Sequence, residues 1–150
     1  MSDSAGSLSQ AKTARMPDMK TRLSTLWIFA MLNYLYADIV TLMDPEARKI
    51  IQSGSVGPLQ INQGFLLGAA ILMETAIAMV LLSRVLKYRA NRWANVIAGI
   101  IHTAAMSLSL LTSTPAPYYI FFPAMEIPCT LFIIWLALRW KPDAAPAAAA

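Results

Sequence analysis

The stretch Ile61–Ser83 constrains the fold of this chain more strongly than any other. It is an almost wholly apolar run that holds a single charged residue, Glu74, near its middle. A helix of about 20 residues, rising about 1.5 Å per residue, crosses a hydrocarbon core about 30 Å thick. The run therefore predicts a membrane-spanning helix. A carboxyl group inside such a helix is costly unless it has a partner or a proton, so Glu74 marks a candidate functional site.

The composition of the whole chain supports a membrane location. Hydrophobic residues make up 57% of its 150 residues and charged residues only 13%, whereas soluble domains contain about 25% charged residues. The formal net charge is +4, but the basic residues flank apolar runs, which excludes nucleic acid as the expected partner. The single cysteine, Cys129, excludes a disulfide framework and a vicinal thiol pair within the chain.

Four apolar runs predict an all-α fold, an integral membrane four-helix bundle. The predicted spans are about residues 23–43, 61–83, 94–112 and 118–140. They lie within a membrane domain of residues 22–141. Residues 1–21 are polar and without period, and residues 142–150 are rich in Ala and Pro. Because neither segment can bury an apolar face, we predict that both are disordered.

Basic residues mark one side of the predicted bundle. The connection between the second and third spans contains four bases and no acid, namely Arg84, Lys87, Arg89 and Arg92. The positive-inside rule then places this connection and both chain termini in the cytoplasm. The same four side chains are candidates for contact with lipid head groups.

The connections on the opposite side have no net charge. In the first of them, Asp44 followed by Pro45 predicts a short helix over residues 45–52, because Asp caps helix starts and proline fits the first helical position. The other, residues 113–117, is short and uncharged. It predicts that the third and fourth spans form an antiparallel hairpin.

Polar residues from all four spans fall at similar depths. Counted from the flanking bases at about 1.5 Å per residue, Asn33, Glu74 and His102 lie about 15 to 16 Å deep. On the same count Glu126 lies about 20 Å and Asp38 about 24 Å deep. Since a charge that faces lipid is costly, these side chains are expected to point into the bundle. The five residues therefore form a candidate polar or proton-titratable site near the membrane midplane.

Helical spacing supports this inward orientation. In the third span, His102 shares a stripe with Asn95 and Gly99. In the fourth span, Glu126 shares a stripe with Tyr119, Phe122, Cys129 and Thr130. In the first span, Tyr34 and Asp38 share a face, whereas Asn33 lies on a different one.

Two further patterns concern helix packing and shape. Gly64 and Gly68 form a G-x-x-x-G pattern, which allows another helix to approach closely. Pro123 and Pro128 each remove a backbone N–H and so predict a kink in the fourth helix around Glu126. An interrupted helix beside a midplane acid is typical of transporter binding sites, although membrane helices also tolerate proline well.

The residues leave two functional hypotheses open. The first is a small proton-linked transporter or small-molecule binder with a polar midplane site. The alternative is a non-catalytic structural or accessory subunit whose buried polar residues set the helix packing. Membrane lipids are the expected partners in both, and both are compatible with a homo-oligomer. The sequence contains no nucleophile motif that would indicate an enzyme, and no spacing of His with acids that would indicate a metal site, so we expect neither metal nor cofactor.

Three runs carry a resemblance to a known family. They read LSTLWIFAMLNYLYADIVTLMD, QGFLLGAAILMETAIAMVLLSRVLKYRANRWANVIAGIIHT and YYIFFPAMEIPCTLFIIWLALRW. The chain resembles an uncharacterised bacterial family of small four-span membrane proteins, a domain of unknown function. This resemblance implies a multi-pass protein of the bacterial inner membrane and no established activity. In layout the chain is also similar to DoxX-like proteins, but it shares no motif residue with them.

Overall fold

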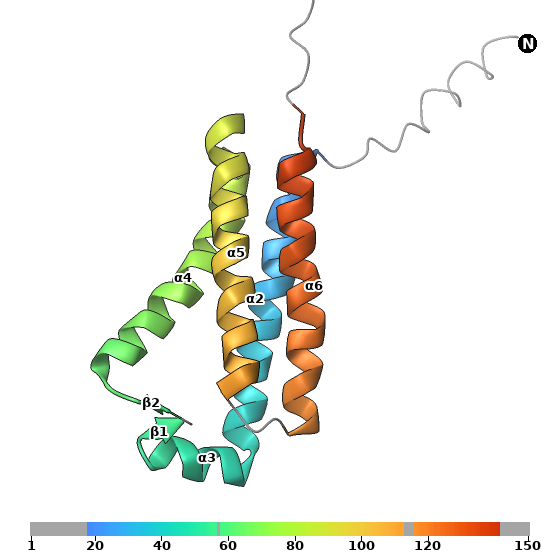
Figure 1. Ribbon diagram of the computed structural model, residues 1–150. Coiled ribbons are helices and arrows are strands. Elements are labelled where there is room, and N and C mark those ends of the chain that lie inside the picture. The colour runs from blue at the N-terminus through green and yellow to red at the C-terminus, as the bar shows by residue number, and fades with distance from the viewer. Residues whose placement is uncertain (1–17, 57, 113–115, 142–150) are drawn as a thin grey trace, which may run out of the picture.

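The computed structural model describes residues 18–56, 58–112 and 116–141 and is dominated by helices (Figure 1). In chain order its elements are α2 (Met19–Met43), α3 (Pro45–Gln52), β1 (Ser55–Val56), β2 (Leu59–Gln60), α4 (Gln63–Val85), α5 (Tyr88–Thr112) and α6 (Pro117–Arg139). Of these, α2, α4, α5 and α6 are long and apolar enough to cross a membrane. The protein is therefore an all-α, multi-pass membrane protein, as the sequence predicts.

The four long helices alternate in direction along the chain. In Figure 1, α2 and α5 begin at the end of the bundle where α4 and α6 finish. α5 packs against α6, and α2 packs against both α4 and α6. α4 leans away from the other three, and every side chain in residues 63–71 is exposed. Only the C-terminal part of α4 joins the core.

The core is a column of apolar side chains at the centre of the bundle. From α2 it contains Leu23, Trp27, Ala30 and Tyr34, which recur at helical spacing. They meet Ala76 and Met79 of α4, Ala98 of α5, and Cys129, Ile133 and Leu136 of α6. Many large apolar side chains remain exposed on the outside, as expected for a surface that faces lipid.

A buried network of polar side chains joins α2, α4 and α5 within this core. Asn95 Oδ1 accepts hydrogen bonds from Trp27 Nε1 at 2.7 Å and from Ser83 Oγ at 3.2 Å. Asn95 Nδ2 donates to the side-chain oxygen of Asn91 at 2.7 Å, and Asn91 Nδ2 donates to the Ser83 carbonyl at 2.6 Å. We call these four residues the amide network. Its polar groups satisfy one another, so it fixes the relative position of three helices.

The connection after α2 forms the short helix that the sequence predicts. Asp44 caps α3, because its Oδ1 accepts a hydrogen bond from the Glu46 N–H at 3.0 Å, and Pro45 is the first helical residue. The Tyr118 hydroxyl of α6 donates to Asp44 Oδ2 at 2.9 Å. These two bonds, that of Tyr118 first, lower the pKa of Asp44 below its ordinary value. Beyond α3 the chain turns at Gly54, whose φ of 79° suits glycine, into the small antiparallel pair of β1 and β2.

Two helices begin earlier than the predicted spans. α2 starts at Met19 instead of residue 23, because the Asp18 side chain accepts a hydrogen bond from the Thr21 N–H at 2.6 Å and caps the helix. α5 starts at Tyr88 instead of residue 94, so the connection from α4 contains only Leu86 and Lys87. Hydropathy misses such helix ends because their side chains are polar. The segments predicted to be disordered lie outside the described residues, apart from 18–21, of which 19–21 are helical.

The fourth span keeps its helix through both internal prolines. α6 runs from Pro117 to Arg139, with Pro123 and Pro128 inside it. The kink expected at these positions stays a prediction, as does the cytoplasmic location of the chain termini. The preceding connection was predicted as a tight turn, but residues 113–115 of it lie outside the described part of the chain.

The glycine at the closest helix contact is Gly99, not a member of the G-x-x-x-G pair. A Cβ atom at Gly99 would lie 2.6 Å from Ile134 Cγ1 of α6. A Cβ atom at Gly68 would meet nothing within 4 Å, and one at Gly64 would meet only the Asn62 side chain. Gly99 therefore lets α5 approach α6, and a packing role for Gly64 and Gly68 stays a prediction.

We expect a Gly99→Ala substitution to lower the thermal stability of the detergent-solubilised protein. The added methyl group would force Ile134 or the α6 backbone to move, and overpacking of this kind costs about 1–3 kcal/mol. Gly68→Ala is the matched control, because it adds the same group to an exposed site on a membrane helix. Equal melting temperatures for the two variants would contradict the assigned role of Gly99.

Candidate functional site

Two of the predicted site residues are buried inside the bundle. His102 of α5 is 1% exposed and Glu126 of α6 is 0% exposed. Each lies on the inward stripe that its helix was predicted to have. The α5–α6 interface that holds them is also joined by a hydrogen bond of 2.7 Å between the hydroxyls of Thr103 and Thr130.

Tyr34 of α2 completes a cluster with these two residues. Its ring stacks on the His102 ring with centroids 5.3 Å apart, and Trp27 meets His102 edge-on, also at 5.3 Å. Tyr34 and Glu126 are close enough to interact electrostatically. We call Tyr34, His102 and Glu126 the central cluster. Three helices thus bring a phenol, an imidazole and a carboxyl group together inside the bundle.

The polar atoms of the central cluster are buried without hydrogen-bond partners. Among the described residues, no partner reaches the Tyr34 hydroxyl, His102 Nε2 or either carboxyl oxygen of Glu126. Most buried polar groups in native proteins are paired, and leaving one unpaired costs about 1–3 kcal/mol. The amide network nearby is paired. The central cluster therefore differs from the amide network, because it holds buried polar atoms that no described residue pairs.

Asp38 lies at the edge of this cluster. It follows Tyr34 by one helical turn, is exposed on α2, and interacts electrostatically with Glu126. It could extend the cluster from the bundle interior to the surface. Cys129, one turn after Glu126, is buried and donates weakly to the Leu26 carbonyl at 3.6 Å, which is a packing contact.

Two other predicted site residues lie apart from the cluster. Asn33 donates its side-chain N–H to the Phe29 carbonyl of its own helix at 2.9 Å. Glu74 is exposed, on the helix that leans away from the other three, and the described residues provide it with no hydrogen bond or ion pair. In the described structure, α2, α5 and α6 each contribute a residue to the central cluster, and Glu74 of α4 does not belong to it.

Tyr34 is the member that sequence reasoning did not select. A signal for it existed, because Leu23, Trp27, Ala30 and Tyr34 follow one face of α2 at spacings of three and four. That face carries the core residues of α2, so a hydroxyl on it must be buried. The sequence pattern placed Tyr34 on the same face as Asp38, but Tyr34 was not among the predicted site residues.

The comparisons with known proteins bear on this arrangement. A family model described as a family of unknown function, DUF6326, matches residues 15–147. The chain belongs to this family. The match includes all four long helices and the central cluster, so the cluster lies within the DUF6326 domain. Neither the comparison with curated proteins nor the comparison with solved structures gave a match, and the likeness to DoxX-like proteins has no support.

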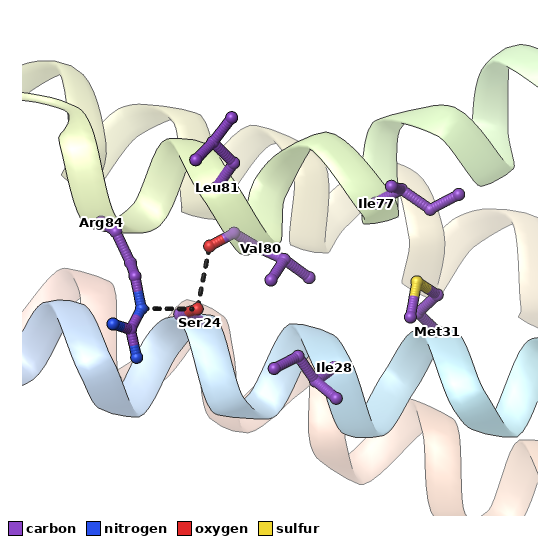
Figure 2. A pocket seen from close by; sticks show the side chains of 7 residues that line it. All are labelled: Ser24, Ile28, Met31, Ile77, Val80, Leu81 and Arg84. Atoms are coloured by element: carbon purple, nitrogen blue, oxygen red, sulfur yellow. Dashed lines mark hydrogen bonds between the residues drawn. The ribbon is translucent and has the colours of Figure 1, made fainter.

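A groove on the surface of this DUF6326 protein lies apart from the cluster. Figure 2 shows it between α2 and α4, with Ile28, Met31, Ile77, Val80 and Leu81 as its apolar walls. Its volume is about 340 Å³. At one end Arg84 Nε donates to Ser24 Oγ at 3.3 Å, and Ser24 Oγ donates to the Val80 carbonyl at 2.8 Å. None of the central-cluster residues lines this groove, which has the character of a lipid-facing surface.

The chemistry available to the DUF6326 site is proton exchange and hydrogen bonding. A carboxyl group and an imidazole can each hold or release a proton, and a phenol can donate a hydrogen bond. Within the described ranges, no three His, Cys, Asp or Glu side chains are grouped as metal ligands would be.

Proposed function

We propose that this protein is a proton-linked binder or transporter of a small polar molecule, in the inner membrane of a bacterium. The central cluster would hold the proton and the ligand. The observation that supports this proposal is the set of four buried polar atoms without partners in Tyr34, His102 and Glu126. A membrane bundle that served packing alone would have little reason to keep them.

Charge considerations favour a proton-linked site. An ionised carboxylate in an apolar interior is strongly disfavoured unless a cation or several donors compensate it. Among the described residues, Glu126 has no such partner. Its charge state is therefore expected to change when a cation or a donor enters, or when His102 takes a proton. Asp38 offers a second carboxyl group through which a proton could reach the cluster from the surface.

Infrared difference spectroscopy of the lipid-reconstituted protein tests this proposal without knowledge of the ligand. A protonated carboxyl group has a C=O stretching band that disappears when the group ionises. We expect a pH-dependent band that is missing from Glu126→Gln and present in Glu74→Gln, because Glu74 lies apart from the cluster. A pH titration of that band that Glu126→Gln leaves unchanged would refute the assignment of the proton to Glu126.

The amide network favours a second candidate function, that of a structural or accessory membrane subunit. Its four residues connect three helices through buried hydrogen bonds and leave no group in need of a ligand. Under this alternative the polar interior would set helix register only. Proton uptake into sealed vesicles, followed with an enclosed pH dye, separates the two: uptake that depends on Glu126 supports a transporter.

A further inference from the structure

A hollow at one end of the bundle has the features of an anion site. It lies where α5 begins and α6 ends, has a volume of about 490 Å³, and is lined by Tyr88, Arg92, Leu138, Arg139, Trp140 and Lys141. Three of these six side chains are cationic and none is acidic. In Figure 1 this end is also where α4 finishes and α2 starts, so Lys20 and Arg84 belong to it as well. We call this end of the bundle the basic end.

Arg92 is held in place while part of its guanidinium group stays without a partner. Its Nη1 donates to the Tyr88 hydroxyl at 3.5 Å, and that hydroxyl donates to the Trp140 carbonyl at 2.7 Å. The Tyr88 and Trp140 rings meet edge-on with centroids 5.2 Å apart. Arg92 Nε is buried, and no described residue accepts a hydrogen bond from it. Arg84 at the same end differs, because its Nε donates to Ser24.

The start of α5 adds to the positive potential of this hollow. α5 is 25 residues long, begins at Tyr88 and has no acidic residue in its first turn. The first N–H groups of a helix lack partners inside the helix and carry a partial positive charge, so they favour a bound anion. The helix start and the side chains of Arg92 and Lys141 therefore add positive charge at this hollow. The Arg139 guanidinium lies over the Trp135 ring at 4.6 Å, and the C-terminal carbonyl groups of α6 oppose part of this charge.

We propose that the hollow between Tyr88, Arg92 and Trp140 binds the phosphate group of an anionic phospholipid. The hollow also has apolar walls, and these favour a lipid over free phosphate as the ligand. Leu138 and the two aromatic rings provide apolar surface beside the cations, and Leu138 is 47% exposed on the outside of α6. A phosphodiester with acyl chains matches both parts, and Tyr and Trp are typical of the membrane interface at which head groups lie. This site is independent of the function proposed for the central cluster.

Native mass spectrometry of the full chain in a non-ionic detergent tests this site. Phosphatidylglycerol and phosphatidylcholine with identical acyl chains would be titrated in parallel. We expect phosphatidylglycerol to bind at least about tenfold more tightly, and Arg92→Gln and Lys141→Gln each to weaken its binding about fivefold. Lys141 is exposed, so its replacement tests the site even if Arg92→Gln fails to fold.

Arg89→Gln is the matched control, because Arg89 is an exposed base three residues before Arg92 on α5 and does not line the hollow. Its loss of affinity should stay within about twofold. A loss equal to that of Arg92→Gln would show diffuse attraction instead of a site and would overturn the proposal. Equal affinity for both lipids would do the same.

Two further measurements complete the test. Inorganic phosphate is expected not to displace the lipid at equal concentration, and phosphate binding as strong as that of phosphatidylglycerol would overturn the lipid assignment. Asp143 lies outside the described residues, two positions after Lys141. A strong gain of affinity in Asp143→Asn would mean that this acid already neutralises the cations, which also contradicts the proposal.

Discussion

Replacement of Asn95 by alanine is expected to destabilise the protein by about 2–4 kcal/mol, because it leaves several buried polar groups without partners at once. Asn95 Oδ1 is the acceptor for both Trp27 and Ser83, and Asn95 Nδ2 is a donor to Asn91. All four residues of the network are buried. An indole N–H, a hydroxyl and an amide oxygen would lose their bonds inside an apolar bundle, where no bulk water can replace them.

Asn33→Ala provides the control for this comparison. Asn33 is also an asparagine in a membrane helix, but its side chain bonds only to a carbonyl of its own helix. Polar contacts in membrane bundles are worth about 0.6 kcal/mol on average, so this change should be close to neutral. Thermal unfolding in detergent measures both variants. Comparable melting temperatures would show that the amide network does not hold α2, α4 and α5 together.

The fold was predictable from sequence because its signals are strong and local. Long, mainly apolar runs define the four long helices, and the pair Asp44 and Pro45 defines α3 over residues 45–52, as the structure shows. The predicted spans leave out the polar first residues of α2 and α5. Hydropathy identifies apolar residues only, so it does not reveal that Asp18 caps α2 or that Arg89 and Arg92 are helical. Helix ends depend on such local bonds, which apolar content does not reveal.

The site was predictable only in part, because depth does not determine which helices meet. His102 and Glu126 are both buried, and Tyr34 of α2 stacks on His102 and interacts electrostatically with Glu126. Glu74 has a similar predicted depth, yet α4 diverges from the bundle and leaves it exposed. The direction in which α4 leaves the bundle follows from no periodic pattern in its sequence. Tyr34 belongs to the cluster because it lies on the face of α2 that carries the core residues.

Buried polar groups with and without hydrogen-bond partners are expected to respond in opposite ways to apolar substitution. Glu126→Met should stabilise the protein by about 1–3 kcal/mol, because methionine fills a similar volume and removes two buried oxygens that have no partner. Thr130→Val, one turn further on α6, should destabilise it by about 0.5–1.5 kcal/mol, since the Thr130 hydroxyl is bonded to that of Thr103. Melting temperatures in the same detergent measure both.

A stabilising Glu126→Met substitution would bear directly on function. A carboxyl group that lowers stability is retained in proteins mainly where it serves binding or catalysis, since stability and activity commonly trade against each other. The variant should also lack the pH-dependent carboxyl band proposed above. If Glu126→Met instead unfolded at a lower temperature, the carboxyl group would have to be stabilising the helix packing. The central cluster would then belong with the amide network as a structural feature, and the accessory-subunit alternative would be favoured.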